Sequence, residues 1–275
     1  MPELPEVETV VRGLRAAVVG DTVESVWIGS RHQPLKSPAA EIAATLEGAK
    51  ITAVRRMGKH IVVDLAGDSR ARAATRAGNR HWIVHLGMTG QLVVVRPEAE
   101  IPKHTHLIAR LASGRELRFT DPRMFGKLAV TRDFDPGGSE PLDLAFDDFA
   151  PLFHRRKTPI KSALLNQQLL RGVGNIYADE ALFRAGIRPR RRAASLTRAE
   201  LRRLYDSVQQ VLHEAIAAGG SSVSDYVGAT GEPGFFQLQH RVYGREGRPC
   251  LKCKTPIQRI VISGRSSHYC PKCQK

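Results

Sequence analysis

The hydrophobic pattern of the chain changes once, and this change limits the fold more than any other feature. From residue 21 to 131, apolar residues mostly form short runs rich in β-branched and aromatic side chains, each bounded by Gly, Pro or charged residues. These runs predict eight strands, at 22–28, 51–55, 61–65, 82–86, 92–95, 107–111, 117–119 and 128–131. Many short strands at this spacing are typical of a β-sandwich or barrel.

A helical pattern replaces these runs after residue 143. Apolar residues then recur at spacings of three and four, which is typical of helices with one buried face. The longest such stretch begins with Thr197 and Glu200, a pair that predicts a capping box, and it ends at Gly219 and Gly220. The pattern therefore predicts an α+β chain of several domains, in which a β-rich part precedes a helical part.

Composition marks the boundaries between these parts. Pro and Gly cluster at 133–143, where the strand pattern ends, so we interpret this stretch as a linker. We expect a β-rich domain at 1–132, a helical domain at 144–240 and a cysteine-containing unit at 241–275. Residues 66–80 are polar and rich in arginine without periodicity, and they predict a mobile loop.

The chain carries a large excess of positive charge. Lys and Arg number 42 against 27 for Asp and Glu, which gives a formal charge of +15 at pH 7. Such an excess indicates a polyanionic partner, most commonly nucleic acid; a basic protein without such a partner is the alternative. The chain does not open with a secretory signal, and no stretch reaches the roughly 18 apolar residues of a membrane span. We therefore expect a cytoplasmic protein that does not bind membranes.

All four cysteines lie near the end of the chain. Cys250 and Cys253 form one C-x2-C knuckle, and Cys270 and Cys273 form a second. Two such knuckles supply the thiolates of a closed structural zinc site, whereas a redox-active pair is the alternative. We expect one zinc ion per chain, which folds a β-hairpin and, without an open coordination position, takes no part in catalysis. The hairpin would present Arg265 at its exposed end.

Within residues 171–177, two glycines precede the start of a predicted helix. Gly172 and Gly174 allow close approach of a ligand to the backbone, and helix N-termini bind phosphate groups. A plain turn between two helices is the alternative. Because Arg156 and Lys161 stand nearby in a strongly basic chain, we favour a phosphate site.

The first residues, MPELPEVE, predict a helix that does not account for the whole stretch. Pro5 suits the first helical position, and Glu6 complements the positive end of the helix dipole. Apolar residues then follow at helical spacing. Pro2 and Glu3 precede this helix, so its formation gives them no role.

Eight segments resemble motifs of the bacterial formamidopyrimidine-DNA glycosylases, in the same order. They are the MPELPEVE start, RRMGKH (55–60), HLGMTG (85–90), DPRMFG (121–126), GVGNIYADEALF (172–183), GEPGFF (231–236), VYGREG (242–247) and the cysteine hairpin ending in HYCPKCQK. The resemblance implies an N-terminal β-sandwich, a helix–two-turn–helix domain and a C-terminal zinc finger. It also implies a monomer, associated with the bacterial nucleoid, that binds damaged double-stranded DNA between its two domains.

In that family the N-terminal proline is the nucleophile. Removal of Met1 would free the Pro2 nitrogen as an amine, which attacks C1′ of a damaged nucleotide and forms a Schiff base. The resemblance thus implies a glycosylase and AP lyase that excises oxidised purines, such as 8-oxoguanine and formamidopyrimidines, and cuts the strand by β,δ-elimination. Glu3 would carry protons, Glu6 would position groups, and Lys59 would assist proton transfer and contact the lesion. Helix-dipole complementation by the two glutamates and a solvated surface charge on the lysine are the alternatives.

The resemblance also assigns residues to DNA binding. Met88, Arg123 and Phe125 match the trio that fills the gap left by an extruded nucleotide, although Met88 and Phe125 in isolation would be interpreted as core. Five residues match positions that contact DNA phosphates in the family: His104, Arg156, Lys161, Asn175 and Arg265. Arg265 is also expected to assist the second strand cut. The alternative is that Arg265 is a solvated charge in the turn of the hairpin.

The chain departs from the usual family pattern at three positions and in one loop. Met124 stands where Arg is usual, Thr89 where Ser is usual and His268 where an aromatic residue is usual, and the 66–80 loop is longer. The substitution at Met124 removes a charge next to the gap-filling residues. None of these departures touches the predicted nucleophile.

Two other classes of protein are competing interpretations. Nei-type glycosylases, which remove oxidised pyrimidines, are disfavoured by the PELPEVE start and by 231–236, which resembles the capping loop for purine lesions. A non-catalytic DNA-binding protein with zinc would retain the basic surface and the cysteines. Nothing in such a protein would require Pro2, Glu3 and Lys59 together.

Overall fold

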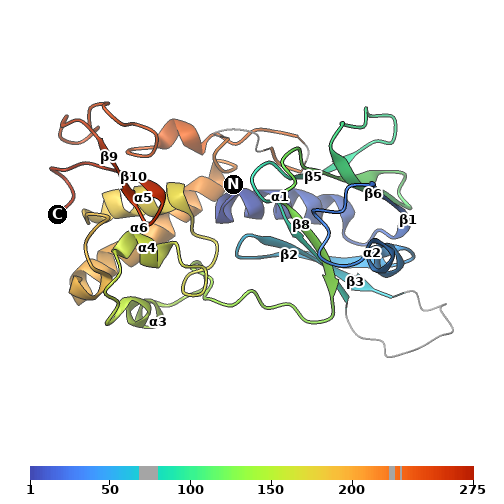
Figure 1. Ribbon diagram of the computed structural model, residues 1–275, viewed down its shortest axis with the longest axis horizontal. Coiled ribbons are helices and arrows are strands. Elements are labelled where there is room, and N and C mark those ends of the chain that lie inside the picture. Colours follow the sequence, from blue (N-terminus) through green and yellow to red (C-terminus); the bar gives the residue numbers. More distant parts are fainter. Residues whose placement is uncertain (68–79, 223–226, 230) are drawn as a thin grey trace. The chain divides into compact units, whose positions relative to one another are not determined.

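The computed structural model describes residues 1–67, 80–222, 227–229 and 231–275. The chain forms two compact units, which are described separately (Figure 1). The first comprises Met1–Asp135 with Gly219–Gly234, and the second comprises Pro136–Ala218 with Phe235–Lys275. The predicted loop at 66–80 lies almost entirely outside the described residues.

Helix α1 (Leu4–Val18) opens the first unit. Pro5 lies in its first turn, as expected from a ring that presets the helical φ angle and needs no N–H partner. The residue before the helix, Glu3, is its N-cap. The apolar side chains predicted to share one face are buried: Val7, Val10, Val11 and Leu14.

The described first unit contains two four-stranded antiparallel sheets. The first has the strand order β1 (Val23–Ile28), β6 (Thr105–Leu111), β7 (Glu116–Thr120) and β5 (Gln91–Val95). The second has the order β2 (Lys50–Met57), β3 (His60–Ala66), β4 (Arg80–His85) and β8 (Lys127–Thr131). All eight predicted strands are present, and the two sheets share one hydrophobic core with α1. The predicted β-sandwich is confirmed.

Helix α2 (Ala39–Leu46) was not predicted from the sequence. It packs against β1 and β8 and buries Ile42 and Leu46, which are four residues apart and therefore share one face. Its eight residues span about two turns, too few for the hydrophobic period to stand out in the sequence.

The second unit contains the helices. They are α3 (Phe146–Phe149), α4 (Ile160–Leu164), α5 (Asn175–Ala185) and α6 (Arg198–Ala217), with 3₁₀ turns at Ala150–Phe153, Ala193–Ser195 and Phe236–Gln239. The capping box predicted for α6 is present, because the Thr197 hydroxyl accepts from the Glu200 N–H and the Glu200 carboxylate accepts from the Thr197 N–H. Helix α5 packs against α6 on one side and against the cysteine hairpin on another.

The hairpin consists of β9 (Gln258–Ile262) and β10 (Arg265–Tyr269). Ser263 and Gly264 connect the strands with φ angles of 47° and 74°. Two successive residues with positive φ are typical of a type I′ turn, whose twist matches that of the strands. Arg265 is therefore the first residue of β10, immediately after the turn.

Among the described residues, no helix is both long and apolar enough to cross a membrane.

Candidate active site and nucleic-acid interface

The start of α1 gathers the first three predicted catalytic residues. Pro2, Glu3 and Glu6 are buried, whereas Met1 is half exposed. One oxygen of the Glu6 carboxylate accepts the backbone N–H of Glu3 at 2.8 Å, and the other accepts the N–H of Ser221 at 2.7 Å. Glu6 is therefore held at both oxygens, and it fixes the backbone of Glu3 next to Pro2.

Gly220 permits this arrangement. Its φ angle is +81°, and a Cβ atom placed on it would lie 2.9 Å from Oε1 and 3.2 Å from Cα of Glu6. Gly234 approaches the same backbone so closely that its own Cβ would lie 2.3 Å from the Gly220 carbonyl oxygen. Glycine is required at both positions, because a side chain would push this segment away from Glu6.

Lys59 lies in the turn between β2 and β3, and its side chain is 8% exposed. The sequence placed it at the start of a strand; the strand begins one residue later, at His60. Arg56 connects this turn to α1, because its guanidinium lies 3.0 Å from the Glu8 carboxylate and donates to the Gly58 carbonyl. The loop that carries Lys59 is thereby fixed against the first turns of α1.

A half-buried histidine lies near Lys59. Desolvation and, to a smaller extent, the positive charges of His60, Lys127 and Lys59 together lower the pKa of His85 to about 4. Its Nδ1 accepts the N–H of Gly87 at 3.0 Å, which a neutral imidazole can do and an imidazolium cannot. His85 is therefore neutral at physiological pH and adds no charge beside Lys59.

The gap-filling residues predicted by resemblance are exposed. Met88 and Phe125 are 39% and 53% exposed, and the Arg123 guanidinium lies 5.1 Å from the centre of the Phe125 ring. Interpreted as isolated residues, Met88 and Phe125 would belong to the core. They lie instead on two loops of the first unit, where a cation and an aromatic ring stack together.

A buried carboxylate holds these two loops together. Asp121 is fully buried; its Oδ1 accepts the Thr89 hydroxyl at 2.6 Å and the Arg123 N–H at 3.2 Å, and its Oδ2 accepts the Gly126 N–H at 2.7 Å. The hydroxyl of Thr89 therefore performs the bonding that the usual Ser would perform. Met124, between the exposed Arg123 and Phe125, has a φ angle of 56°.

His104 is half-buried immediately before β6, and its carbonyl accepts the N–H of Asp121 at 2.9 Å. The same buried aspartate thus connects His104 to the loop that carries Arg123. Two predicted DNA-contact residues of the first unit, His104 and Arg123, are therefore joined through Asp121.

In the second unit, Ser266 brings three predicted phosphate-binding residues together. The ammonium of Lys161 donates to its carbonyl at 2.5 Å, and the amide of Asn175 donates to its hydroxyl at 3.2 Å. Arg265 precedes Ser266 and is exposed. Asn175 is the first residue of α5, so the N-terminus of that helix, which carries the positive end of its dipole, lies beside the hairpin.

The structure corrects the prediction that Lys161 contacts DNA phosphates. Its side chain is fully buried, and its ammonium lies 2.7 Å from Oδ1 of Asp179, which is also fully buried. A buried cation with a buried carboxylate partner is not available to a ligand at the surface. Lys161 therefore orders the junction of α4, α5 and β10, which in turn fixes Asn175 and Arg265.

Replacing Lys161 with Met is expected to destabilise the protein by about 3–5 kcal/mol, because Asp179 would remain buried without its cation. Urea unfolding measures this change. Lys157→Met is the matched control: Lys157 is exposed in the same segment, and the change should fall within about 0.5 kcal/mol. A Lys161→Met protein as stable as wild type would contradict a structural role for this lysine.

Arg156 is exposed, and its Nε donates to the Leu152 carbonyl at 2.6 Å. This bond fixes the base of the guanidinium and leaves its outer nitrogens at the surface.

The four cysteines gather into one cluster, in which the sulfur atoms all lie within 4.8 Å of one another. The Sγ atoms of Cys250 and Cys273 are 3.9 Å apart, and those of Cys253 and Cys270 are 3.4 Å apart. A zinc ion with four sulfur ligands at about 2.3 Å requires sulfur–sulfur distances of about 3.8 Å, so the cluster fits this ion. Hydrogen bonds from Thr255 lower the pKa of Cys253 to about 6.

Two acidic residues of α5 were missed although the GVGNIYADEALF motif contains them. Asp179 accepts the N–H of His268 at 2.9 Å in addition to its ion pair with Lys161. Glu180 accepts the N–H groups of Arg241, Val242 and Tyr243, and its burial raises its pKa. Both carboxylates fasten the cysteine unit to α5.

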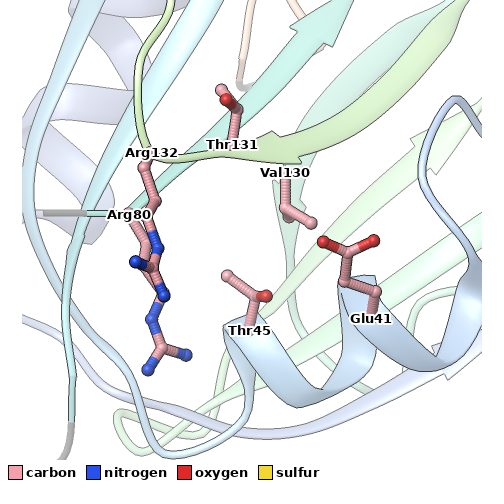
Figure 2. A pocket seen from close by; sticks show the side chains of 6 residues that line it. All are labelled: Glu41, Thr45, Arg80, Val130, Thr131 and Arg132. Carbon is pink, nitrogen blue, oxygen red and sulfur yellow. The ribbon is translucent and has the colours of Figure 1, made fainter. Parts of the chain in front are cut away.

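A separate pocket lies beside α2 in the first unit (Figure 2). Its lining comprises Glu41, Thr45, Arg80, Val130, Thr131 and Arg132. Figure 2 shows the side chains of Arg80 and Arg132 on one side of this pocket and Glu41 on the other. None of the predicted site residues lines it.

Comparison with known proteins decides the family. Three domain profiles match: the formamidopyrimidine-DNA glycosylase N-terminal domain at residues 1–128, the formamidopyrimidine-DNA glycosylase H2TH domain at 138–227, and the zinc finger found in FPG and IleRS at 247–275. The formamidopyrimidine-DNA glycosylase of Solibacter usitatus is 48% identical, and the alignment covers 100% of both chains. The chain belongs to the formamidopyrimidine-DNA glycosylase family. The enzyme of Gluconobacter oxydans is 43% identical, again over 100% of both chains.

Solved structures of this family share the fold. The MutM (FPG) protein of Thermus thermophilus has 41% identity and a TM-score of 0.84, over 99% of this chain and 98% of that one. The Lactococcus lactis Fpg, in complex with DNA that contains an abasic site, has 31% identity and a TM-score of 0.88 over 99% of each chain. The family assignment, the multidomain fold and a zinc-finger domain with four clustered cysteines are thereby established.

Proposed function

We propose that this member of the family excises oxidised purines from double-stranded DNA and then cuts the strand through a Schiff base on Pro2. One observation carries the proposal. A proline at the second position is buried beside two buried glutamates, of which Glu6 accepts the backbone N–H groups of Glu3 and Ser221. Relatives in complex with DNA that contains Fapy-dG or an abasic site support the substrate class.

The proposed nucleophile arises when Met1 is removed. The Pro2 nitrogen then becomes a secondary amine, and an α-amino group with a pKa of about 7.7–8.0 is partly unprotonated at neutral pH. Its lone pair attacks C1′ of the damaged nucleotide, the bond from C1′ to the base breaks, and the base leaves with a proton. The sugar ring opens to an iminium ion, which makes the protons on C2′ acidic. Elimination of the 3′ phosphate and then of the 5′ phosphate follows.

The buried carboxylates supply proton transfer and positioning. We propose that Glu3 carries protons to and from the sugar, and that Glu6 keeps the backbone of Glu3 in place through its two hydrogen bonds. Glu3 is also the N-cap of α1, so it has a structural role in addition. Lys59 would place its ammonium near the lesion, on the turn that Arg56 fastens to α1.

DNA binding requires a nucleotide to leave the stack. We propose that Met88 and Phe125 fill the resulting gap, and that Arg123 addresses the orphaned base. Their exposure and the stacking of Arg123 on Phe125 support this role. Phosphate contacts would come from His104, Arg156, Asn175 and Arg265. Lys161 is omitted because it is buried.

Zinc would be held by Cys250, Cys253, Cys270 and Cys273, with one ion per chain. The ion supplies a cross-link between the two knuckles and leaves no position for a substrate. We further propose that the protein acts as a monomer on chromosomal DNA in the bacterial cytoplasm.

The test uses duplexes that differ in one nucleotide: 8-oxoguanine, a formamidopyrimidine, an oxidised pyrimidine or undamaged guanine. Base release and both strand cuts are measured on each duplex, together with borohydride trapping. The proposal expects fast release and trapping on the two purine lesions. Faster release of the oxidised pyrimidine would favour a Nei-type specificity, and binding without release would favour a non-catalytic DNA-binding protein.

Arg265→Ala is expected to weaken DNA binding by about 1–3 kcal/mol and to slow the second elimination more than base release. Arg265 lies exposed beside the hairpin turn, and a guanidinium binds two phosphate oxygens in a geometry that lysine cannot copy. Arg265→Lys should therefore restore only part of the loss. The three rates are measured on one 8-oxoguanine duplex with zinc content as the control; wild-type values throughout would leave Arg265 as a solvated charge.

A further inference from the structure

A second concave site of the first unit lies where β1 ends and β6 begins. Its volume is about 180 Å³, and eight residues line it: Trp27, Gly29, Ser30, Arg31, Lys103, His104, Thr105 and His106. We refer to it as the Trp27 pocket. Of these residues, only His104 belongs to the proposed DNA-binding set.

Trp27 is unusual in its exposure. The chain has two tryptophans; Trp82 is 1% exposed in the core, whereas Trp27 is 52% exposed on β1. β1 is an edge strand of its sheet. Exposing a large aromatic side chain forfeits hydrophobic stabilisation, so the indole is available to a ligand rather than used by the fold.

The backbone beside the indole leaves room for its ring. A Cβ atom on Gly29 would lie 3.3 Å from Cη2 of Trp27 and 3.3 Å from the Thr105 carbonyl oxygen. The N–H of Gly29 donates to the His106 carbonyl at 3.0 Å, which fixes the floor of the pocket. The indole therefore rests against bare backbone on one side, and a side chain at position 29 would press on it and on the Thr105 carbonyl.

The rim of the pocket is positively charged. Arg31 and Lys103 are exposed, His104 is half-buried, and no carboxylate is among the lining residues. Arg31 and Lys103 form no ion pair within the part of the chain that the structure describes. An exposed aromatic ring beside unpaired cations is the combination that binds unpaired nucleotides, because the ring stacks on the base and the cations neutralise the phosphate.

We propose that the Trp27 pocket binds one unpaired nucleotide of DNA, with its base on the indole and its phosphate at Arg31 and Lys103. Sites that enclose a whole small-molecule ligand have volumes of about 300–1,000 Å³. The volume of the Trp27 pocket is smaller, so the pocket suits one base, with the phosphate at its rim. Bases inside an intact duplex are stacked and unavailable. The ligand is thus DNA with a single-stranded segment, a gap or a frayed end.

This proposal rests on the proposed function, because His104 would contact a phosphate of the same DNA. It extends that function beyond the lesion: the strand cut leaves ends that can fray, and the Trp27 pocket would hold a nucleotide of a frayed end, whereas Arg123 would address the orphaned base. Undamaged single strands should bind there equally well, since stacking does not depend on the lesion.

Tryptophan fluorescence tests the proposal with the intact protein. Oligothymidylate is the probe, and an intact duplex of the same length is its comparison. Because Trp82 is buried, quenching reports on Trp27. We expect oligothymidylate to quench the emission and the intact duplex to bind with much less quenching. A duplex that quenches as strongly as the single strand, or a single strand that does not quench, would overturn the proposal.

Variants give an independent measurement through the anisotropy of labelled oligothymidylate. Trp27→Leu should weaken binding by about 5- to 150-fold, the range expected for one stacked base, and Trp27→Phe should retain part of the affinity. Gly29→Val should weaken binding less than Trp27→Leu, because a branched side chain there presses on the indole without removing it. Arg132→Ala is the control, since it removes one exposed positive charge at the other pocket of the same unit.

Different experimental results would refute the Trp27 pocket and the proposed function. Trp27→Leu should excise 8-oxoguanine from an intact duplex at the wild-type rate. A wild-type protein without excision activity would refute the proposed function alone. An active wild-type protein whose Trp27→Leu variant binds oligothymidylate as tightly as the parent would refute the Trp27 pocket alone.

Discussion

Borohydride is expected to link the protein covalently to an 8-oxoguanine duplex through Pro2, and one additional residue before Pro2 should abolish the link. An added residue that is not cleaved turns the amine into an amide, whose lone pair is delocalised into the carbonyl. Trapping and strand cutting should then fall by at least about a thousandfold, as expected when an enzyme loses its nucleophile. Pro2→Gly keeps a primary amine and should trap weakly.

Controls separate this chemistry from binding and folding. The affinity for a duplex with a stable abasic analogue should remain similar in all three proteins, because the phosphate contacts are unchanged. Mass spectrometry of the intact protein establishes whether Met1 is removed. Equal trapping by the extended protein would refute Pro2 as the nucleophile and leave a lysine, with Lys59 first, as the candidate.

The second large effect is expected from the zinc site: Cys253→Ser should lose the metal, unfold the hairpin and weaken DNA binding strongly. The hydrophobic cluster around the cysteines is small and contains Phe183, Val242 and Ile257. Such a cluster cannot order a hairpin alone, so a bound zinc ion would supply the missing folding free energy. Loss of the Arg265 contact with DNA, and of the hydrogen bond from Asn175 to Ser266, should reduce the affinity for DNA on the order of tenfold to a hundredfold or more.

Metal analysis, circular dichroism and DNA titration measure these outcomes in parallel. Lys252→Ser is the matched control, since Lys252 lies exposed between two ligands of the same knuckle and donates nothing to the metal. The β-sandwich of the first unit should remain folded in Cys253→Ser, because its core contains no cysteine. Full DNA affinity in a zinc-free protein would show that the hairpin needs no metal.

Local patterns were sufficient for much of the fold. The strands follow from β-branched runs bounded by turn residues, and the capping box of α6 follows from Thr197 and Glu200, which interact across one turn. Helix α2 was missed because two buried residues in eight do not establish a period. The segment Gly219–Gly234 was assigned to the helical part by its position in the chain, yet it packs with the first unit, where Ser221 meets Glu6.

At the candidate site, too, some features could be predicted from the sequence and others only from the tertiary structure. Residue type and spacing alone predicted that the four cysteines form one site, where the structure gathers them, and the order of the motifs identified the family, because both are properties of the linear chain. Burial was decided only by the tertiary structure. It placed Lys161 on Asp179 inside the second unit and left Met88, Phe125 and Trp27 at the surface. The reason is physical: whether a side chain meets water depends on segments distant in sequence, and spacing does not record which of them cover it.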